Sequence, residues 1–203
     1  MDKPLELIVL SNTTASDTLI DHLVREEPLM LGYRTIQKRV TYTIPSVPGT
    51  ELQFAASINH YLVRKGYDET RIFHAVYALN EAILNGIHHA GHDTPENTTK
   101  LEWEIVRDQQ EDYLLVRFRF PGDGFDVHKA QVNPIVEGEI WKQRHGRGHM
   151  YLARFSEYVA YTNHGRDLHL VFKLGKSATE EEVLPLDPAR HGKEVEEEYL
   201  KAN

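Results

Sequence analysis

The sequence contains no cysteine, which excludes a disulfide framework and a thiolate metal site. No apolar run approaches the roughly 20 residues that a membrane-spanning helix needs, and no cleavable signal is evident. Acidic residues outnumber basic ones by 31 to 23, so the net charge is −8. This balance disfavours a nucleic-acid partner, because phosphate binding needs a concentrated basic surface. These absences predict a cytoplasmic protein that contacts neither membrane nor nucleic acid directly.

The composition is that of a folded domain. The chain has 203 residues, of which 40% are hydrophobic and 27% charged, and these values are typical of globular proteins. We expect an N-terminal βα extension over residues 1–37, with a strand at Leu5–Leu10 and a helix at Asp17–Glu26. The main domain is expected over residues 38–175 and an acidic tail over residues 176–203. Whether the extension completes a sheet, covers an edge or mediates assembly stays open at this point.

The order of elements in the main domain predicts an α+β fold. Alternating apolar residues and turn signals indicate strands, and apolar residues three and four apart indicate helices. The expected elements are a strand Arg39–Ile44, helices from Thr50 to Lys65 and from Asp68 to Ala90, strands Leu101–Val106 and Tyr113–Phe120, a helix His149–Ser156, and a hairpin of Tyr158–Thr162 with Leu168–Leu174. This order predicts a two-layer sandwich, with a mostly antiparallel sheet and helices on one face.

The longest predicted helix carries the first candidate motif. Val76, Leu79, Ile83 and Ile87 form an apolar stripe, whereas Glu81, Asn85 and His89 stand four apart on the opposite side. A carboxylate, an amide oxygen and an imidazole in a row suit a magnesium–phosphate group beside a general base. Taken alone, the row is more often the wet side of an amphipathic helix.

Two glycine-containing motifs follow. Pro121–Asp126 comes directly after a strand, and its glycines allow a sharp turn and a close approach to a ligand; a simple turn is the commoner explanation. His145–His149, of sequence H-G-R-G-H, precedes a short helix. Exposed amides at a helix start beside an arginine form a cradle for an anion.

Together, and in this order, the three motifs resemble those of the anti-sigma regulatory factors and serine-protein kinases among the histidine-kinase-like (Bergerat, GHKL) ATPases. The family's N box, E-x-x-x-N-x-x-x-H, is matched by Glu81, Asn85 and His89. Its D-x-G-x-G-F-D turn is matched from Gly122 onward, and its H-G-R-G lid end by residues 145–148. The resemblance covers about Arg39 to Leu174 and implies the two-layer ATPase fold.

The resemblance also implies functional roles. Glu81 would accept the proton from a partner's serine, and Asn85 would ligate Mg²⁺ with ATP bound. The residues implied to hold ATP are Asn85, His89, Gly122, Gly124, Phe125, Gly146, Arg147 and Gly148. The implied activity is a serine/threonine protein kinase that regulates transcription, with an anti-anti-sigma protein or a sigma factor as partner; the family's frequent pairing also allows a homodimer.

Two residues depart from the family pattern. Phe120 stands where the family has the aspartate that reads the adenine amino group, and His169 stands by register where a threonine assists it. These rings could stack on a purine or could fill the adenine slot. The second outcome favours a non-catalytic module that binds a sigma factor or another regulator.

The histidines raise a third class of site. Neutral imidazoles four apart can hold zinc, and candidates are His88, His89 and His92 with Asp93, and His145 with His149. The chain lacks an H-E-x-x-H motif, and the first cluster overlaps the N box, so zinc is the weaker interpretation.

Overall fold

The computed structural model describes residues 8–9, 17–26, 32–108, 110–124, 148–179 and 183–189. In chain order the elements are β1 (Ile8–Val9), α1 (Asp17–Arg25), β2 (Arg34–Pro45), α2 (Thr50–Arg64), α3 (Glu69–Asn85), the π-helix η1 (Gly86–Ala90), β3 (Thr98–Arg107), β4 (Asp112–Arg119), α5 (Gly148–Phe155), β5 (Tyr158–Thr162) and β6 (Asp167–Gly175). The predicted α+β class is confirmed. No helix within the described ranges is long and apolar enough to cross a membrane.

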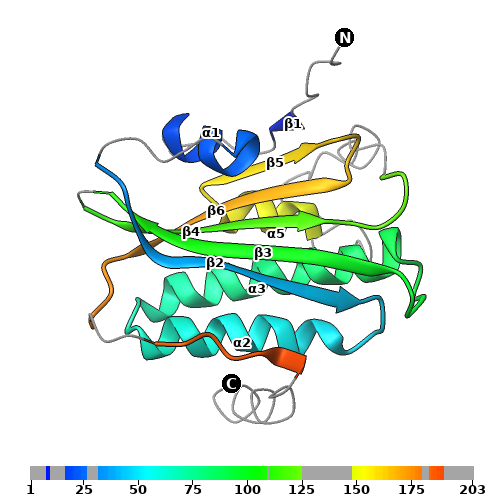
Figure 1. The fold of residues 1–203 in the computed structure, drawn as a ribbon, viewed down its shortest axis with the longest axis horizontal. Helices are drawn as coiled ribbons and strands as arrows, with labels where there is room; N and C mark the ends of the chain where they lie inside the picture. The colour runs from blue at the N-terminus through cyan, green and yellow to red at the C-terminus, as the bar shows by residue number, and fades with distance from the viewer. Residues whose placement is uncertain are drawn as a thin grey trace, which may run out of the picture.

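The strands form one six-stranded sheet in the order β1-β5-β6-β4-β3-β2 (Figure 1). Every neighbouring pair is antiparallel. The N-terminal strand β1 pairs with β5, with Ile8 opposite Tyr161. The N-terminal extension therefore contributes a strand to one edge of the sheet, a question that the sequence left open.

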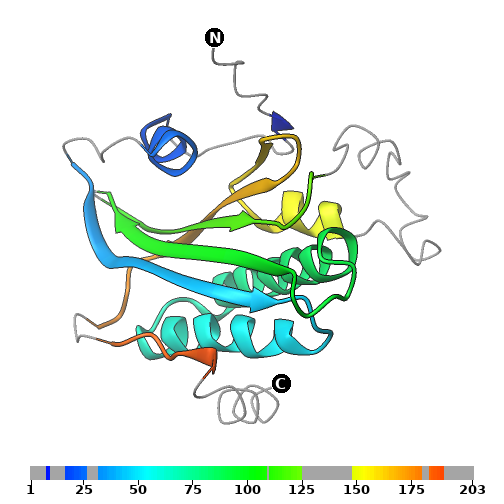
Figure 2. The same cartoon turned by 45° about the vertical axis from the view of Figure 1, so that its right-hand side comes forward.

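The inner face of the sheet, which we define by Trp103, Phe118 and Leu170, packs against α2, α3 and α5 (Figures 1 and 2). The predicted apolar stripe, which runs along α3 into η1, is confirmed, because its residues are at most 3% exposed within this core: Val76, Leu79, Ile83 and Ile87. Burying a large aliphatic side chain stabilises a fold by about 1.5–3 kcal/mol. This packing fixes which side of α3 is left for ligands.

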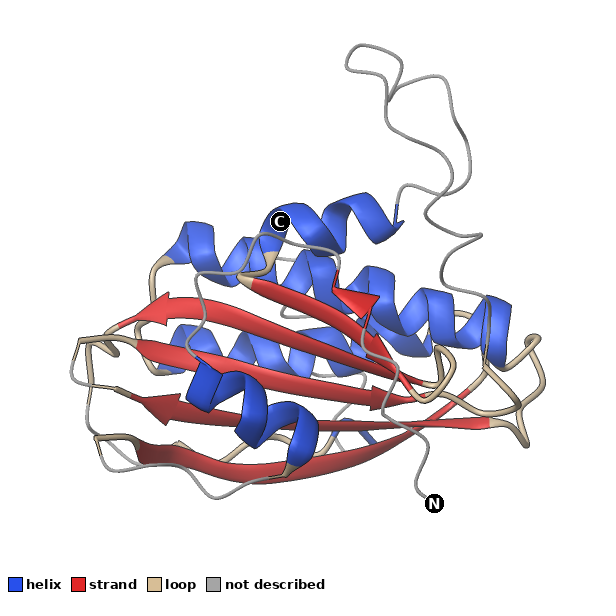
Figure 3. Ribbon diagram, turned by 90° about the horizontal axis from the view of Figure 1, so that it is seen from above, coloured by secondary structure: helices blue, strands red, loops and turns tan. Residues whose placement is uncertain are grey.

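The outer face of the sheet is covered in part by α1, which lies on the side opposite α2 and α3 (Figure 3). Leu19 and Leu23 are 1% and 3% exposed, and they pack in a second apolar cluster with Leu115 and Val171. The expectation of helices on one face, made for the main domain, thus holds, and α1 of the N-terminal extension adds a helix on the other face. Helix α1 packs there because β4 and β6 carry apolar side chains on both faces.

The predicted long helix ends in a π-helical turn that follows α3. Asp68 caps the helix start by accepting a hydrogen bond from the Arg71 amide at 3.0 Å. After Asn85 the chain forms a π-helix, and the Gly91 amide donates to the Gly86 carbonyl at 2.7 Å. The helix reaches Ala90 as predicted, but its last turn has i→i+5 bonding, which is frequent at functional sites.

Part of the segment predicted as an acidic tail packs on the domain. Val183 is 5% exposed and belongs to the main core. The Leu186 carbonyl accepts hydrogen bonds from Tyr42 Oη at 2.9 Å and from Ser57 Oγ at 2.7 Å. Residues 183–187 therefore pack against α2 and β2, and the orange segment beside α2 in Figure 1 shows their position.

The second cluster under α1 gives a stability prediction. Leu19→Ala should lower the free energy of unfolding by about 2–5 kcal/mol, because it leaves a cavity beneath α1. Chemical denaturation measures the change. Leu184→Ala is the matched control, since Leu184 is 73% exposed and should cost less than about 0.5 kcal/mol. Equal effects of the two substitutions would contradict the placement of α1.

Candidate functional site

The structure brings the first and third motifs together. Glu81 and Asn85 lie on α3 and are half-buried. A Cβ added at Gly148, the first residue of α5, would lie 2.9 Å from Asn85 Nδ2, 3.3 Å from Asn85 Oδ1 and 3.3 Å from Glu81 Oε2. Glycine at this position lets the backbone come this close without a shift of either side chain. The start of α5 is thereby held against the polar side of α3.

Asn85 has an unused hydrogen-bonding group in this contact. Its Nδ2 atom is buried and has no hydrogen-bond partner among the described residues. A buried donor left unpaired costs about 1–3 kcal/mol, so such a group calls for an explanation such as a ligand. A carboxylate and an amide oxygen beside a helix start suit a hard cation and the phosphates that it accompanies. The residues present therefore fit Mg²⁺ with a nucleotide phosphate chain.

His89 does not continue the row of Glu81 and Asn85. It lies in η1 and is exposed, because the π turn changes the helical register after Asn85. A neighbouring imidazole, His149 on α5, stacks on Tyr161 with ring centroids 5.6 Å apart. Burial lowers the pKa of His149, and the nearby charge of His89 lowers it further. His89 thus lies at the edge of the site, close to the start of α5.

The second motif lies at the end of η1. Gly122 and Gly124 have φ angles of 76° and 86°, which L-residues rarely adopt. A Cβ at Gly122 would be 3.8 Å from the Ala90 carbonyl, and one at Gly124 only 2.1 Å from the His164 carbonyl. The glycines therefore let this turn fit between η1 and the β5–β6 turn. The other predicted ligand residues, Phe125, Gly146 and Arg147, lie outside the described residues.

Phe120 is packed between β4 and the helix. Its side chain is 3% exposed, and its ring stacks on Phe118 at 5.9 Å. Its Cε1 atom lies 2.8 Å from the Cβ position of Gly86, so the absence of a side chain at Gly86 makes room for this ring. The ring fills the space between Gly86 and Phe118, and whether it stacks on a purine or closes the adenine slot stays a prediction.

The placement of His169 beside Phe120 is wrong. Along β6, Leu168 and Leu170 belong to the core of the inner face, whereas Val171 belongs to the cluster under α1. His169 therefore points to the outer face, where its Nε2 lies 2.9 Å from Thr162 Oγ1. Alternation along a strand means that a register error of one residue reverses the face. Leu168 is the neighbouring inner-face residue, opposite Phe118 in β4.

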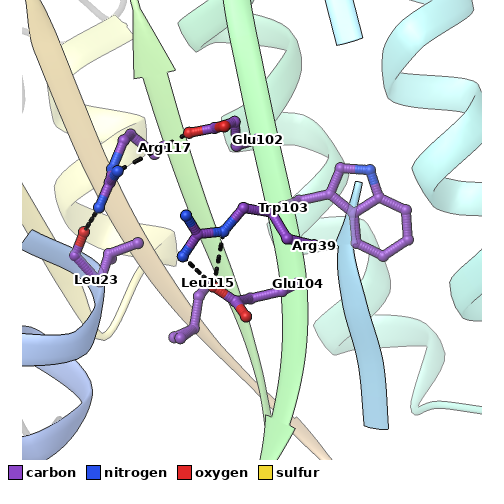
Figure 4. Close-up of a pocket in the computed structure, with 7 residues that line it drawn as sticks. All are labelled: Leu23, Arg39, Glu102, Trp103, Glu104, Leu115 and Arg117. Atoms are coloured by element: carbon purple, nitrogen blue, oxygen red, sulfur yellow. Dashed lines mark hydrogen bonds and ion pairs between the residues drawn. The ribbon is translucent and has the colours of Figure 1, made fainter. Parts of the chain in front are cut away.

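A small pocket lies on the outer face, away from Glu81 and Asn85. Figure 4 shows its lining residues: Leu23, Arg39, Glu102, Trp103, Glu104, Leu115 and Arg117. Glu104 Oε1 accepts from Arg39 at 3.0 Å and lies 3.2 Å from His22 Nε2. The buried Arg117 guanidinium bonds the Leu23 carbonyl and the Glu26 carboxylate. This network attaches α1 to the sheet, and its role is structural.

The zinc interpretation gains no support. Within the part of the chain that the structure describes, no group of three or more His, Cys, Asp or Glu residues is arranged to hold a metal ion. His88 Nδ1 instead lies 2.8 Å from Asp93 Oδ1. His145, from the second candidate pair, lies outside the described residues.

Comparison with known families agrees with this geometry. Residues 45–172 match the histidine kinase-like ATPase domain, and this span contains α2, α3, the glycine turn and α5. The chain belongs to the histidine kinase-like ATPase domain family. Nucleotide and ATP binding fit this family. No curated protein matches the chain.

The outer-face position of His169 gives a pH prediction. Burial, with the charges of Arg117 and Arg119, lowers its pKa from 6.5 to about 3. Between these values the unfolded chain binds a proton that the folded chain does not, so the free energy of unfolding falls as pH drops below 6.5. One proton contributes a slope of up to about 1.4 kcal/mol per pH unit. Denaturation at pH 6.5 and at pH 5 should therefore show a smaller loss for His169→Gln than for the wild type.

The comparison of slopes isolates His169 from the other titrating groups. His149, whose pKa is also lowered, contributes with the same sign and is retained in the variant. The pKa of the Glu104 carboxyl is likewise lowered from its ordinary value of 4.5. Glu104 therefore changes the free energy of unfolding only below about pH 4.5, outside the range compared. Identical slopes in the two proteins would show that His169 is not buried in its neutral form.

Proposed function

We propose that this domain binds ATP with Mg²⁺ and transfers the γ-phosphoryl group to a serine of a partner protein, as a kinase of the anti-sigma-factor type. The observation that carries the proposal is the contact of Gly148 with both Glu81 and Asn85. It joins a carboxylate, an amide and a helix start at one point on the surface of α3. A phosphoryl-transfer site needs these groups for its base, its metal and its phosphates.

Each residue has a defined part in the proposed reaction. Asn85 Oδ1 ligates Mg²⁺, and Asn85 Nδ2 and the amides at the start of α5 bind phosphate oxygens. The serine Oγ forms a bond to the γ-phosphorus as the bond to the β–γ bridging oxygen breaks and ADP leaves. Glu81 accepts the serine proton. Arg147, which precedes α5 in the sequence, would neutralise the charge that develops on the phosphoryl oxygens, and the Gly146 amide would donate a hydrogen bond to them.

Phe120 changes the expected recognition of the adenine ring of ATP. The ring beside Gly86 offers no hydrogen-bond acceptor to an amino group. Loss of a buried hydrogen bond to one base group weakens binding by about 1–3 kcal/mol. Most of the binding free energy in this proposal therefore comes from the phosphates and the metal, and selectivity for adenine is low.

The proposal extends to partners. The motifs resemble those of factors that phosphorylate an anti-anti-sigma protein and sequester a sigma factor, so we propose a cytoplasmic partner of one of these kinds. A homodimer is part of the same proposal. The net charge of −8 favours partners with a basic contact surface, since opposite charges steer association.

Replacement of the proposed base tests the reaction. Glu81→Gln should reduce transfer of the γ-phosphoryl group to an anti-anti-sigma-type protein by about 10²–10⁴-fold, the usual contribution of a general base. Binding of ATP with Mg²⁺ should stay within about threefold, because glutamine preserves the shape of the side chain. Transfer is followed with ATP labelled at the γ-phosphate, and binding by calorimetry.

Glu69→Gln provides the matched control for this test. Glu69 lies on the same helix and is exposed, so its replacement should leave both quantities unchanged. Full activity of Glu81→Gln would assign the base to another residue. Loss of nucleotide binding in this variant would instead give Glu81 a role in holding the metal.

A further inference from the structure

Five rings form an aromatic patch on the outer surface of α3 and α5. We define the aromatic patch as Phe73, His74 and Tyr77 of α3 with Tyr151 and Phe155 of α5. His74 stacks on Phe155 with centroids 4.5 Å apart, and Tyr77 meets Tyr151 edge-on at 5.0 Å. Phe73 lies 5.9 Å from Tyr77. The rings are thus in contact with one another across the two helices.

The aromatic patch is open to solvent. Phe73 is 55% exposed, and the other four residues are half-buried. Leu152, which is 0% exposed, and the buried side of Phe155 provide the contact of α5 with the core. The fold therefore does not need the exposed side of these rings, and contiguous exposed apolar surface of this kind marks interaction sites.

The aromatic patch is continuous with the candidate site. Phe73, Tyr77, Glu81 and Asn85 stand four residues apart on α3 and so form one row along the helix. Eight residues separate Phe73 from Glu81, a helical rise of about 12 Å. On α5, Gly148 contacts Glu81 and Asn85, and Tyr151 follows three residues later. Both helices lead from the site directly into the patch.

We propose that the aromatic patch is the docking surface for the protein that presents the acceptor serine. This inference rests on the proposed kinase function and names where its second substrate binds. A nucleotide held at Asn85 and Gly148 leaves Glu81 as the last polar group of the row, so a serine placed there brings its own chain over Tyr77 and Phe73. Aromatic rings supply a large contact area, and the partner accordingly presents an apolar side chain.

The size of the aromatic patch favours a transient substrate over a second copy of the chain. One ring that is 55% exposed and four that are half-buried offer roughly 200–400 Å², since an aromatic side chain buries about 150–250 Å² in full. A stable interface buries about 800 Å² on each partner. A substrate that must leave after each turnover requires no more than the smaller area.

The spacing gives a sequence preference in the acceptor. An extended chain advances about 3.3 Å per residue, so the 12 Å from Glu81 to Phe73 correspond to about three or four residues. A large apolar residue at that separation from the serine should be selected. A library of serine peptides, each position varied in turn, tests this with full-length protein, Mg²⁺ and γ-labelled ATP.

Two variants make the experiment specific. Phe73→Ser should abolish the selected apolar position and raise the KM for the selected peptide about tenfold, with kcat and the KM for ATP unchanged. Val63→Ser is the control, because Val63 is exposed to a similar extent, 56%, but lies on α2, and this variant should behave as the wild type.

Each remaining outcome overturns the inference in a recognisable way. A preference that survives Phe73→Ser would place docking elsewhere while leaving the kinase intact. Nucleotide binding without phosphorylation of any peptide would remove the proposed function itself. A dimer, seen by sedimentation, that Phe73→Ser dissociates would show that a second copy covers the aromatic patch.

Discussion

Helix α3 packs its apolar side on the inner face of the sheet, and the position of every other part of the site follows from this contact. Leu79, Ile83 and Ile87 are fully buried there, which turns Glu81 and Asn85 toward α5. A larger side chain at this interface would displace Glu81 and Asn85 together. A Cβ at Gly86 would lie 2.8 Å from the Phe120 ring, and one at Gly148 would lie 2.9 Å from Asn85 Nδ2. Glycine at these two positions therefore lets the helix, the strand and the start of α5 come together without a shift of these side chains.

The two faces of the sheet pack against different helices. The outer face is closed by α1 through leucine packing, through the hydrogen bond from the buried Arg117 guanidinium to the Leu23 carbonyl, and through the contact of His22 with Glu104. These contacts hold α1 on the sheet. The inner face holds α3 and α5 in place, and these two helices carry the site and the aromatic patch, where polar and aromatic groups remain accessible. Adjacent residues of one strand, such as Arg117 and Phe118, serve the two faces alternately.

The sequence predicted the elements of the main domain closely, because helical and strand periodicities there are strong. The bounds of α2, α5 and β5 agree with prediction to within one residue. Several features that it did not predict depend on tertiary contacts, among them the pairing of β1 with β5, the π turn after Asn85, and the face to which His169 points. The last error came from a one-residue uncertainty of register, which periodicity cannot remove in a strand that is apolar on both sides. Gly148 and Asn85 are far apart in the sequence, and the length of the chain between them does not indicate how close they come in the fold. Only the order of the motifs suggested that they meet.

Calorimetric titration with ATP, with and without Mg²⁺, tests most directly the claim that Glu81, Asn85 and Gly148 form a nucleotide site. The account predicts Mg²⁺-dependent binding to the wild type. Asn85→Ala should weaken this binding by about tenfold to a hundredfold, the equivalent of about 1–3 kcal/mol, and should remove its dependence on Mg²⁺. Absence of binding at millimolar nucleotide, or equal affinity in the variant, would contradict the account and would leave the domain as a scaffold for protein partners with Phe120 closing the space beside α3.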